Sequence, residues 1–147
     1  MRTASANTSA RMILSALWIM FGAVRPAWPL ASMVDEWYRA QLKAVVPSLI
    51  TKWESLMGVT VQRFFVQKMK TKWGSCNARA KSIRLNTELT KKPPECLEYI
   101  LVHELVHLLA RRHDEHFTSL MDRYLPNWRF IRQTLNEAPL AHADWAY

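Results

Sequence analysis

Apolar residues recur at helical spacing across residues 34–57, which predicts a long amphipathic helix. The positions that carry this pattern are Val34, Trp37, Tyr38, Leu42, Val45, Leu49, Trp53 and Leu56. Pro47 lies inside the pattern and is expected to kink or split the helix, because proline cannot donate the backbone hydrogen bond of a helix interior. Gly58 follows the last turn and predicts its end.

After Gly58 the pattern changes to that of β-strands. Residues 59–66 are rich in β-branched and aromatic side chains, which predicts a first strand. Residues 69–73 and 82–86 predict two further strands, and residues 74–77, with the sequence Gly-Ser-Cys-Asn, predict a turn. The sequence therefore predicts one small three-stranded sheet.

Helical patterns return in the last third of the chain. A helix is predicted from about residue 94 to residue 110. Pro93 and Pro94 mark its beginning, because proline is tolerated in the first turn of a helix. Further helices are predicted over residues 115–124 and 128–136, with Pro126 between them. Together with the sheet, these helices indicate an α+β domain over residues 32–147. Four large aromatic residues are expected in its core, namely Trp37, Trp53, Trp128 and Phe130.

Residues 1–31 differ from the rest of the chain. An apolar run over residues 12–24 follows Arg2 and Arg11, and it is shorter than the roughly 20 residues of a membrane span. The run resembles the hydrophobic region of a signal peptide, but no convincing cleavage site follows it. An export signal, a peripheral hydrophobic helix, and a non-native start joined to a truncated domain are the three interpretations, and we favour the last. We therefore set residues 1–31 apart as an atypical hydrophobic or flexible segment.

The chemistry lies in the predicted helix over residues 94–110, which carries the sequence His103-Glu104-Leu-Val-His107. Residues four apart lie on one helical face, so His103 and His107 can offer two imidazole nitrogens to one ion. Glu104 lies one step round the helix, where it can accept a proton from a metal-activated water. Zn²⁺ with three protein ligands keeps a fourth position for such a water and lowers its pKa to roughly 7.

His113 is the candidate third ligand, because a turn after Ala110 would bring its side chain back to the metal. His116 competes for this role, and so do the carboxylates of Glu115 and Asp122. All five histidines of the chain lie in its last third, which favours one local site. The flanks of the motif are apolar, so its helix should be buried. Two histidines and a glutamate buried there without a metal would be costly.

The chain is basic, with a net charge of +8 and a sequence pI of about 9.9, which favours anionic partners. Residues 63–92 hold nine basic residues and one acidic residue, Glu88, and we call them the basic segment. Its basic residues are Arg63, Lys68, Lys70, Lys72, Arg79, Lys81, Arg84, Lys91 and Lys92. The segment can hold nucleic acid or a nucleotide phosphate. The alternative is a solvated sheet edge that uses lysine to discourage aggregation.

The two cysteines, Cys76 and Cys96, are too few for a disulfide framework and do not form a Cys-x-x-Cys pair. Free thiols in a reducing compartment are expected, which favours the cytoplasm. Export or membrane association through residues 12–24 is the alternative. Ser75 and Cys76 are expected to be structural, because the activated water already supplies a nucleophile.

Three blocks of the chain together resemble the YgjP-like metallopeptidase family of bacterial metal-dependent hydrolases. They are residues 70–77 (Lys-Thr-Lys-Trp-Gly-Ser-Cys-Asn), residues 83–86 (Ile-Arg-Leu-Asn), and the His-Glu-Leu-Val-His motif with residues 113–117 (His-Asp-Glu-His-Phe). The resemblance covers residues 34–147, and residues 1–31 do not share it. The chain is more distantly similar to SprT-like proteases, which act on DNA-bound protein.

The resemblance implies a minimal zincin fold, in which a small sheet packs on a backing helix and on the motif helix. It also implies that zinc is the cofactor and that Glu104 is the catalytic residue. The zinc ligands implied in the same way are His103, His107 and His113.

The sequence thus predicts a zinc-dependent hydrolase, and foremost a metallopeptidase that cleaves protein or peptide substrates with Glu104 as general base. A metal-dependent nucleoside triphosphate pyrophosphatase of the UTP type is the alternative enzyme, which the basic segment suits. A nucleic-acid-associated protease or binding module is the third hypothesis. Glu104 argues against a purely structural metal site, because such a site needs no base.

Overall fold

The long helix predicted over residues 34–57 is present as α2 (Leu30–Met57) in the computed structural model, which describes residues 29–137. α2 continues through Pro47, so the predicted split is wrong, and the proline is exposed. The buried face of α2 consists of Leu42, Val46, Ile50, Trp53 and Met57. These positions repeat every three or four residues, so one stripe of the helix faces the core.

The chain divides between Met33 and Val34 into two compact units, and the elements that begin after α2 belong to the second. Residues 1–28, which make up most of the segment predicted to be atypical, lie outside the described part. Within residues 29–137, no helix is both long enough and apolar enough to cross a membrane.

Three strands form a mixed sheet in the order β1–β3–β2. β1 (Arg63–Gln67) pairs in parallel with β3 (Ser82–Asn86), and β2 (Gly74–Asn77) pairs antiparallel with β3. β3 is confirmed with the predicted bounds, and its Ile83 and Leu85 are fully buried. β2 is an edge strand, since no other described strand lies on its outer side.

Residues 69–73, predicted as a strand, are not one, because the buried side chain of Asn86 binds their backbone. Its Nδ2 donates to the carbonyls of Met69 and Lys72 at 2.9 and 2.7 Å. Its Oδ1 accepts from the amides of Met69 and Glu88 at 3.3 and 3.1 Å. One side chain therefore takes the place of a neighbouring strand and fixes the chain just before β2.

Residues 74–77, predicted as a turn, form β2 instead, and the turn lies at residues 78–81. Lys81 takes the left-handed backbone conformation there, with φ of 48°. The first strand also begins later than predicted, at Arg63. The Val61 amide just before it donates to the Glu54 carboxylate at 2.6 Å, which ties this stretch to α2.

The last third of the domain is helical, as predicted. It consists of the 3₁₀ helix η1 (Thr87–Lys91) and of α3 (Pro94–Val106), α4 (Glu115–Tyr124) and α5 (Trp128–Asn136). The bounds predicted for α4 and α5 are confirmed. α3 ends four residues before the predicted Ala110, but the next residue, His107, keeps helical backbone angles of φ −63° and ψ −17°.

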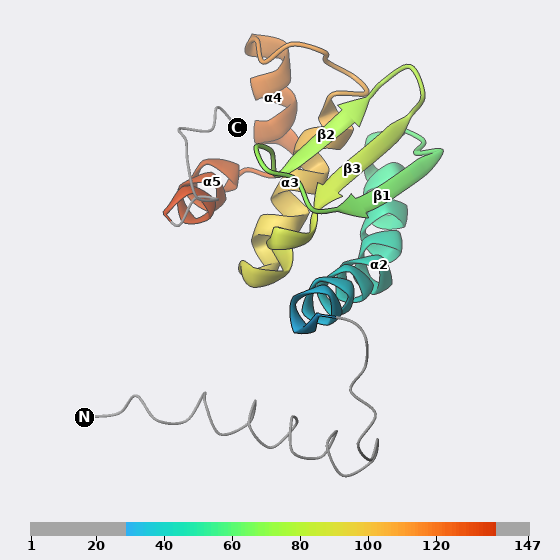
Figure 1. The fold of residues 1–147 in the computed structure, drawn as a ribbon. Coiled ribbons are helices and arrows are strands. Elements are labelled where there is room, and N and C mark those ends of the chain that lie inside the picture. Colours follow the sequence, from blue (N-terminus) through green and yellow to red (C-terminus); the bar gives the residue numbers. More distant parts are fainter. Residues whose placement is uncertain (1–28, 138–147) are drawn as a thin grey trace, which may run out of the picture. The chain divides into compact units, whose positions relative to one another are not determined.

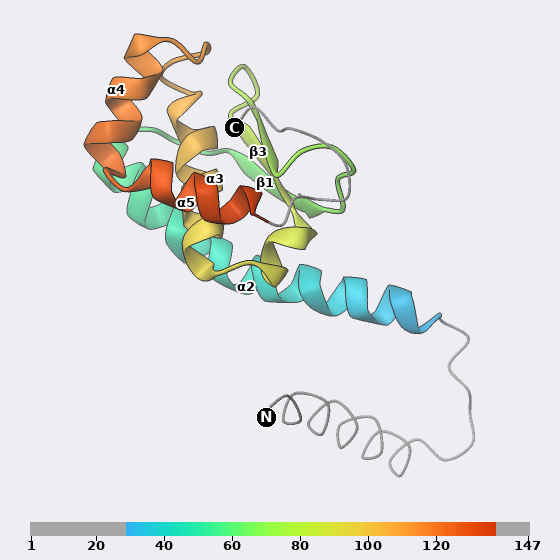
Figure 2. The same ribbon diagram turned by 90° about the vertical axis from the view of Figure 1, so that its left-hand side faces the viewer.

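The helices α2 and α3 lie on one side of the sheet (Figures 1 and 2). α3 packs against β2 and β3 and also against α4 and α5, so it is the central element of the domain. Trp53 is buried and Trp128 packs partly against the core, as predicted. The same prediction is wrong for Trp37 and Phe130, which are 57% and 70% exposed.

Replacing Asn86 with alanine is expected to lower the free energy of unfolding by about 2–4 kcal/mol, because several backbone groups would lose their only described partner. Urea unfolding measures this change. Asn77→Ala is the matched control, since the Asn77 side chain is exposed and accepts one hydrogen bond, from the Ala80 amide at 3.0 Å. The control should lose less than about 1 kcal/mol, and equal losses would show that Asn86 does not hold the loop.

Candidate metal centre

The helix that carries the motif, α3, is buried on nearly every side. Its buried residues form a continuous run over residues 99–106, which is the pattern of a core helix and not of a surface helix. Pro94 and Glu95 occupy its first turn, where proline and negative charge are both favoured. The burial includes two polar side chains, because His103 and Glu104 are each 2% exposed.

His107 is the C-cap residue that follows α3, and it lies one helical turn after His103. Its ring centroid lies 5.0 Å from that of His103. The Nδ1 atom of His107 lies 3.1 Å from the carbonyl oxygen of Ala110, in the turn that follows. When Nδ1 carries the proton it donates to this carbonyl, and Nε2 is then left as the metal-binding nitrogen.

The turn after α3 brings His113 back to the two motif histidines. Asp114, the next residue, caps α4, because its carboxylate accepts a hydrogen bond from the Phe117 amide at 3.0 Å. The Nε2 atoms of His113 and His103 lie 3.0 Å apart. One nitrogen from each of the three histidines lies within 4.8 Å of the others, and no other such group of metal-binding side chains occurs within residues 29–137.

Phe117 and Arg132 lie beside this cluster, and the sequence analysis gave neither of them a role. The buried Phe117 ring lies 4.9, 4.8 and 4.6 Å from the rings of His103, His107 and His113. It fills the space beneath the three imidazoles, and its position four residues after His113 was a usable signal. Arg132 on α5 is close enough for its charge to lower the pKa of His103 and of His113. No sequence pattern marks this arginine.

Glu104 faces β2 at the point where that strand begins. Its Oε1 is buried and has no hydrogen-bond partner among the described residues. A Cβ atom built on Gly74 would lie 2.8 Å from this Oε1 and 2.8 Å from the Cγ2 of Ile100. Only glycine fits there, so the close approach of strand and helix depends on Gly74.

The protonation states of the cluster suit a cation. Burial, followed by the charges of the other two histidines, lowers the pKa of His103 to about 3, and burial also lowers the pKa of His107 and His113. All three imidazoles are therefore neutral at pH 7, as metal ligands must be. Burial raises the pKa of Glu104 to about 8, and Lys72 opposes this rise. A dication held by the histidines would favour the ionised carboxylate.

The three competing candidates for the third ligand do not join the cluster. His116 and Glu115 are exposed on the first turn of α4. Asp122 forms an ion pair with Arg129 and accepts a hydrogen bond from the Trp128 indole at 2.7 Å. Of the candidates considered from the sequence, His113 is the one that the fold brings to the motif.

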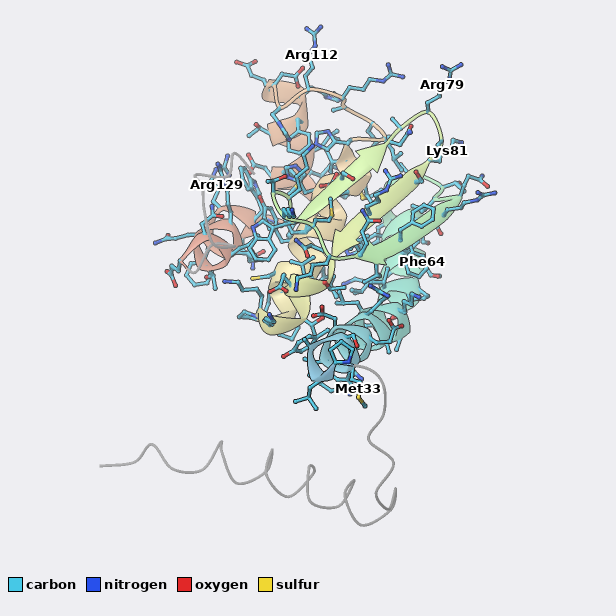
Figure 3. All side chains as sticks on the ribbon, viewed as in Figure 1. Met33, Phe64, Arg79, Lys81, Arg112 and Arg129 are labelled. Carbon is cyan, nitrogen blue, oxygen red and sulfur yellow. The ribbon has the colours of Figure 1, made fainter. Side chains whose placement is uncertain are left out.

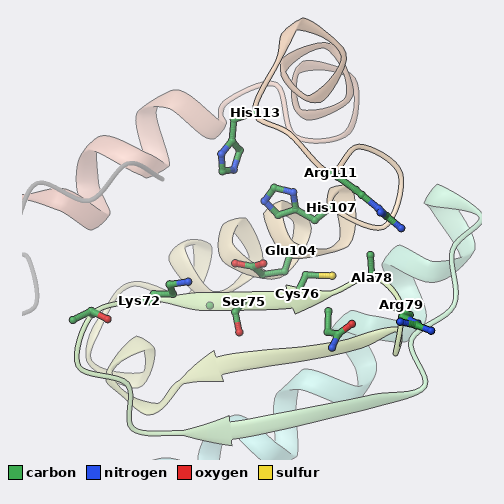
Figure 4. Close-up of a pocket in the computed structure, with 12 residues that line it drawn as sticks. Lys72, Ser75, Cys76, Ala78, Arg79, Glu104, His107, Arg111 and His113 are labelled. Carbon is green, nitrogen blue, oxygen red and sulfur yellow. The ribbon is translucent and has the colours of Figure 1, made fainter.

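An open cleft of about 720 Å³ lies between β2 and the end of α3, and His107, His113 and Glu104 line it (Figure 4). Ser75 and Cys76 of β2 also line this cleft. Burial, followed by the charge of Glu104, raises the pKa of Cys76 to about 11. The thiol is therefore protonated at neutral pH and is a poor nucleophile.

Several cations of the basic segment make contacts within the domain, and others line the cleft. Lys68 and Lys91 form ion pairs with Asp35 and Glu88 at 3.5 and 2.7 Å. Arg84 lies over the ring of Phe65 and Lys92 over the ring of Trp73, each at 5.6 Å from the centroid. Lys72 and Arg79 line the cleft instead. The charges that form a run in the sequence are thus divided among several sites in the fold.

Comparison with known proteins matches this arrangement to a metallopeptidase family. A family model described as YgjP-like, metallopeptidase domain, matches residues 9–138. The match begins before Val34, where the sequence resemblance began, and includes most of the segment set apart as residues 1–31. No curated protein matches the chain at a significant level.

Two solved structures are similar to the domain. The metallopeptidase zymogen abylysin of Pyrococcus abyssi is 21% identical with a TM-score of 0.55, and the match covers 63% of this chain and 90% of that one. The metallopeptidase zymogen jannalysin of Methanocaldococcus jannaschii is 22% identical with a TM-score of 0.52, and the match covers 65% and 94%. At this identity the likeness shows the fold alone. It confirms the predicted α+β, zincin-like architecture.

Gly74→Ala is expected to destabilise the protein by about 1–3 kcal/mol and to reduce hydrolysis, because the added methyl group would displace the Glu104 carboxylate. Urea unfolding and kcat measure the two effects. Gly58→Ala is the control, because a Cβ there meets nothing within 4 Å although φ is +67°. It should lose about 1 kcal/mol of stability and keep its kcat. A similar loss of kcat in both variants would contradict the role given to Gly74.

With added Zn²⁺ as the probe metal, His113→Ala is expected to weaken metal binding roughly 100-fold or more, since even the loss of an outer hydrogen-bond partner costs about 10–100-fold. Competition with a chromophoric chelator measures the affinity. His116→Ala removes an exposed histidine three residues away and should bind zinc as the unmodified protein does. If the two variants bind equally well, His113 is not a ligand.

Proposed function

Because the chain belongs to the YgjP-like metallopeptidase family, we propose that it is a zinc-dependent peptidase whose metal is held by three histidines. The proposed ligands are His103, His107 and His113, and the proposed general base is Glu104. The observation that carries this proposal is the gathering of three neutral imidazole nitrogens within 4.8 Å of one another. The proposed catalytic domain spans residues 32–147.

The donor set supports zinc as the metal. Three imidazoles from one short stretch of chain suit Zn²⁺, whereas Mg²⁺ and Ca²⁺ prefer oxygen ligands. Zinc held by three protein ligands supplies a Lewis acid that lowers the pKa of water to roughly 7. Phe117 would keep the imidazoles apart from bulk water on their inner side, because its buried ring contacts all three.

Glu104 is suited to move protons between the attacking water and the leaving amine. The side chain lines the cleft, and its buried Oε1 has no described hydrogen-bond partner, so no contact within the described domain occupies this oxygen. Gly74 leaves the space that the carboxylate occupies beside β2, because a Cβ there would lie 2.8 Å from Oε1. Such a base takes a proton from water and then donates it to the departing nitrogen.

The position of the edge strand β2 supports the proposal that the substrate is a peptide. An extended peptide can add to an exposed sheet edge through main-chain hydrogen bonds, and β2 borders the cleft directly. The bond to be cut would then lie beside Glu104. The free state of Cys76 and Cys96 supports a reducing compartment, so we place the enzyme in the cytoplasm.

A pyrophosphatase acting on nucleoside triphosphates remains the second candidate, because Lys72, Arg79 and Arg111 line the same cleft. Fewer observations support nucleic-acid binding through the basic segment, because several of its cations contact other side chains of the domain. The assay described next separates peptide hydrolysis from the hydrolysis of nucleoside triphosphates.

Glu104→Gln is expected to reduce peptide hydrolysis by about 10²–10⁴-fold while zinc stays bound, because loss of a general base has an effect of this size. The zinc-loaded protein would be incubated with an unfolded protein and, separately, with UTP, with and without chelator. Glu95→Gln is the matched control, since this exposed glutamate lies on the same helix. If only UTP is consumed, the chain is not a peptidase but the alternative enzyme.

A further inference from the structure

The side chains that line the cleft carry an excess of positive charge. Lys72, Arg79 and Arg111 are exposed and line it, whereas Glu104 is the single acidic residue among the described lining side chains. Glu104 is also buried, so it contributes little negative charge to the mouth of the cleft. A concave surface lined by one sign of charge raises the local concentration of ligands of the opposite sign.

None of these three cations forms an ion pair with a carboxylate among the described residues, although the charge of Lys72 acts on the buried Glu104. The five ion pairs of residues 29–137 involve Arg39, Lys52, Lys68, Lys91 and Arg129, and none of these residues lines the cleft. Elsewhere on the described part of the domain, five of the fourteen basic side chains are paired with nearby acids in this way. At the cleft the positive charge is left for a ligand.

The cations come from separate segments that the fold brings together around the site. Arg79 lies in the turn between β2 and β3, and Arg111 lies in the loop after α3. Figure 4 shows these two arginines at one end of the cleft and Lys72 toward the other end, with Glu104 between them. Figure 3 labels Lys81 near Arg79, in the same turn, and Arg112 in the loop after α3. Two of the three cleft cations thus lie at the arginine end.

From this charge distribution we propose that the cleft selects peptides with acidic side chains on the N-terminal side of the cleaved bond. The proposal rests on the proposed peptidase function and names its substrate class. A peptide that pairs antiparallel with β2 runs from the Arg79 end toward the Lys72 end. Its residues before the cleaved bond then lie near Arg79 and Arg111, where carboxylates accept hydrogen bonds from guanidinium groups.

Acidic peptide fits this cleft better than nucleic acid does. Sites for single-stranded nucleic acid combine a basic groove with aromatic side chains on which the bases stack. Among the described residues that line the cleft there is no phenylalanine, tyrosine or tryptophan. The edge of β2 offers main-chain hydrogen bonds instead, which an extended peptide can use.

The test measures binding and cleavage separately. The zinc-loaded Glu104→Gln variant would be titrated by fluorescence polarisation with a labelled peptide that carries Asp and Glu before the cleavage position. The comparison peptide carries Asn and Gln at the same places. The acidic peptide should bind roughly three- to tenfold more tightly at low salt, and about 0.5 M NaCl should reduce this preference.

Arg79→Gln with Arg111→Gln, added to the same background, should reduce the preference to less than about twofold. Lys43→Gln with Arg63→Gln is the matched control, because it removes the same charge from exposed residues on α2 and on the opposite edge strand. The control should keep the preference. Equal binding of the two peptides would overturn the proposal, and so would an equal loss in both double variants.

A thymidine oligonucleotide is titrated in the same way. If it binds more tightly than the acidic peptide and loses affinity in the Arg79 and Arg111 double variant, the cleft is a nucleic-acid site and the proposal is overturned. Cleavage of the same peptides by the unmodified enzyme is measured in parallel. If the acidic peptide is preferred in binding but not cut, the proposed peptidase function fails, while the assignment of the cleft to acidic peptides stands.

Discussion

The close approach of the β2 backbone to α3 at Gly74 is the contact on which the site depends. A side chain at this position would lie 2.8 Å from both Glu104 and Ile100, so strand and helix can meet only through glycine. The contact brings an edge strand beside the buried motif and forms one wall of the cleft. Asn86 fixes the chain just ahead of it through the carbonyls of Met69 and Lys72.

The same contact explains why the motif helix can be both a core element and a reactive one. A buried carboxylate oxygen without a hydrogen-bond partner costs about 1–3 kcal/mol, and the charge of Lys72 does not cancel the effect of burial on Glu104. The apolar residues of α3 and the ring of Phe117 provide the burial that offsets this cost. Binding of a metal would relieve it, so folding stability and metal affinity should be linked.

The sequence was sufficient for elements defined by local pattern. β3, α4 and α5 have the predicted bounds because their apolar periodicity and their flanking turn or proline signals agree. Residues 69–77 were misassigned because their conformation is set by Asn86, which acts across a gap of 14 to 17 residues. Propensity alone contains no information about such a contact, and a Gly-Ser-Cys-Asn stretch is typical of a turn until a partner strand is present.

Part of the candidate site could likewise be predicted from the sequence, and part of it could not. The spacing of His103 and His107 follows from helix geometry, whereas the return of His113 depends on a turn whose path the sequence leaves open. The role of Gly74 depends on a contact between elements that no local pattern reveals, whereas the position of Phe117, four residues after His113, was a usable signal.

Charge provides the clearest example of this difference between sequence and fold. The basic segment appears in the sequence as one run, yet the fold pairs Lys68 and Lys91 with acids. It combines Lys72 and Arg79 with Arg111, which lies outside the segment, around one cleft. What such charge attracts depends on what else lines the surface. Beside an edge strand, and with no phenylalanine, tyrosine or tryptophan among its described lining residues, it suits a carboxylate-bearing extended chain better than stacked bases.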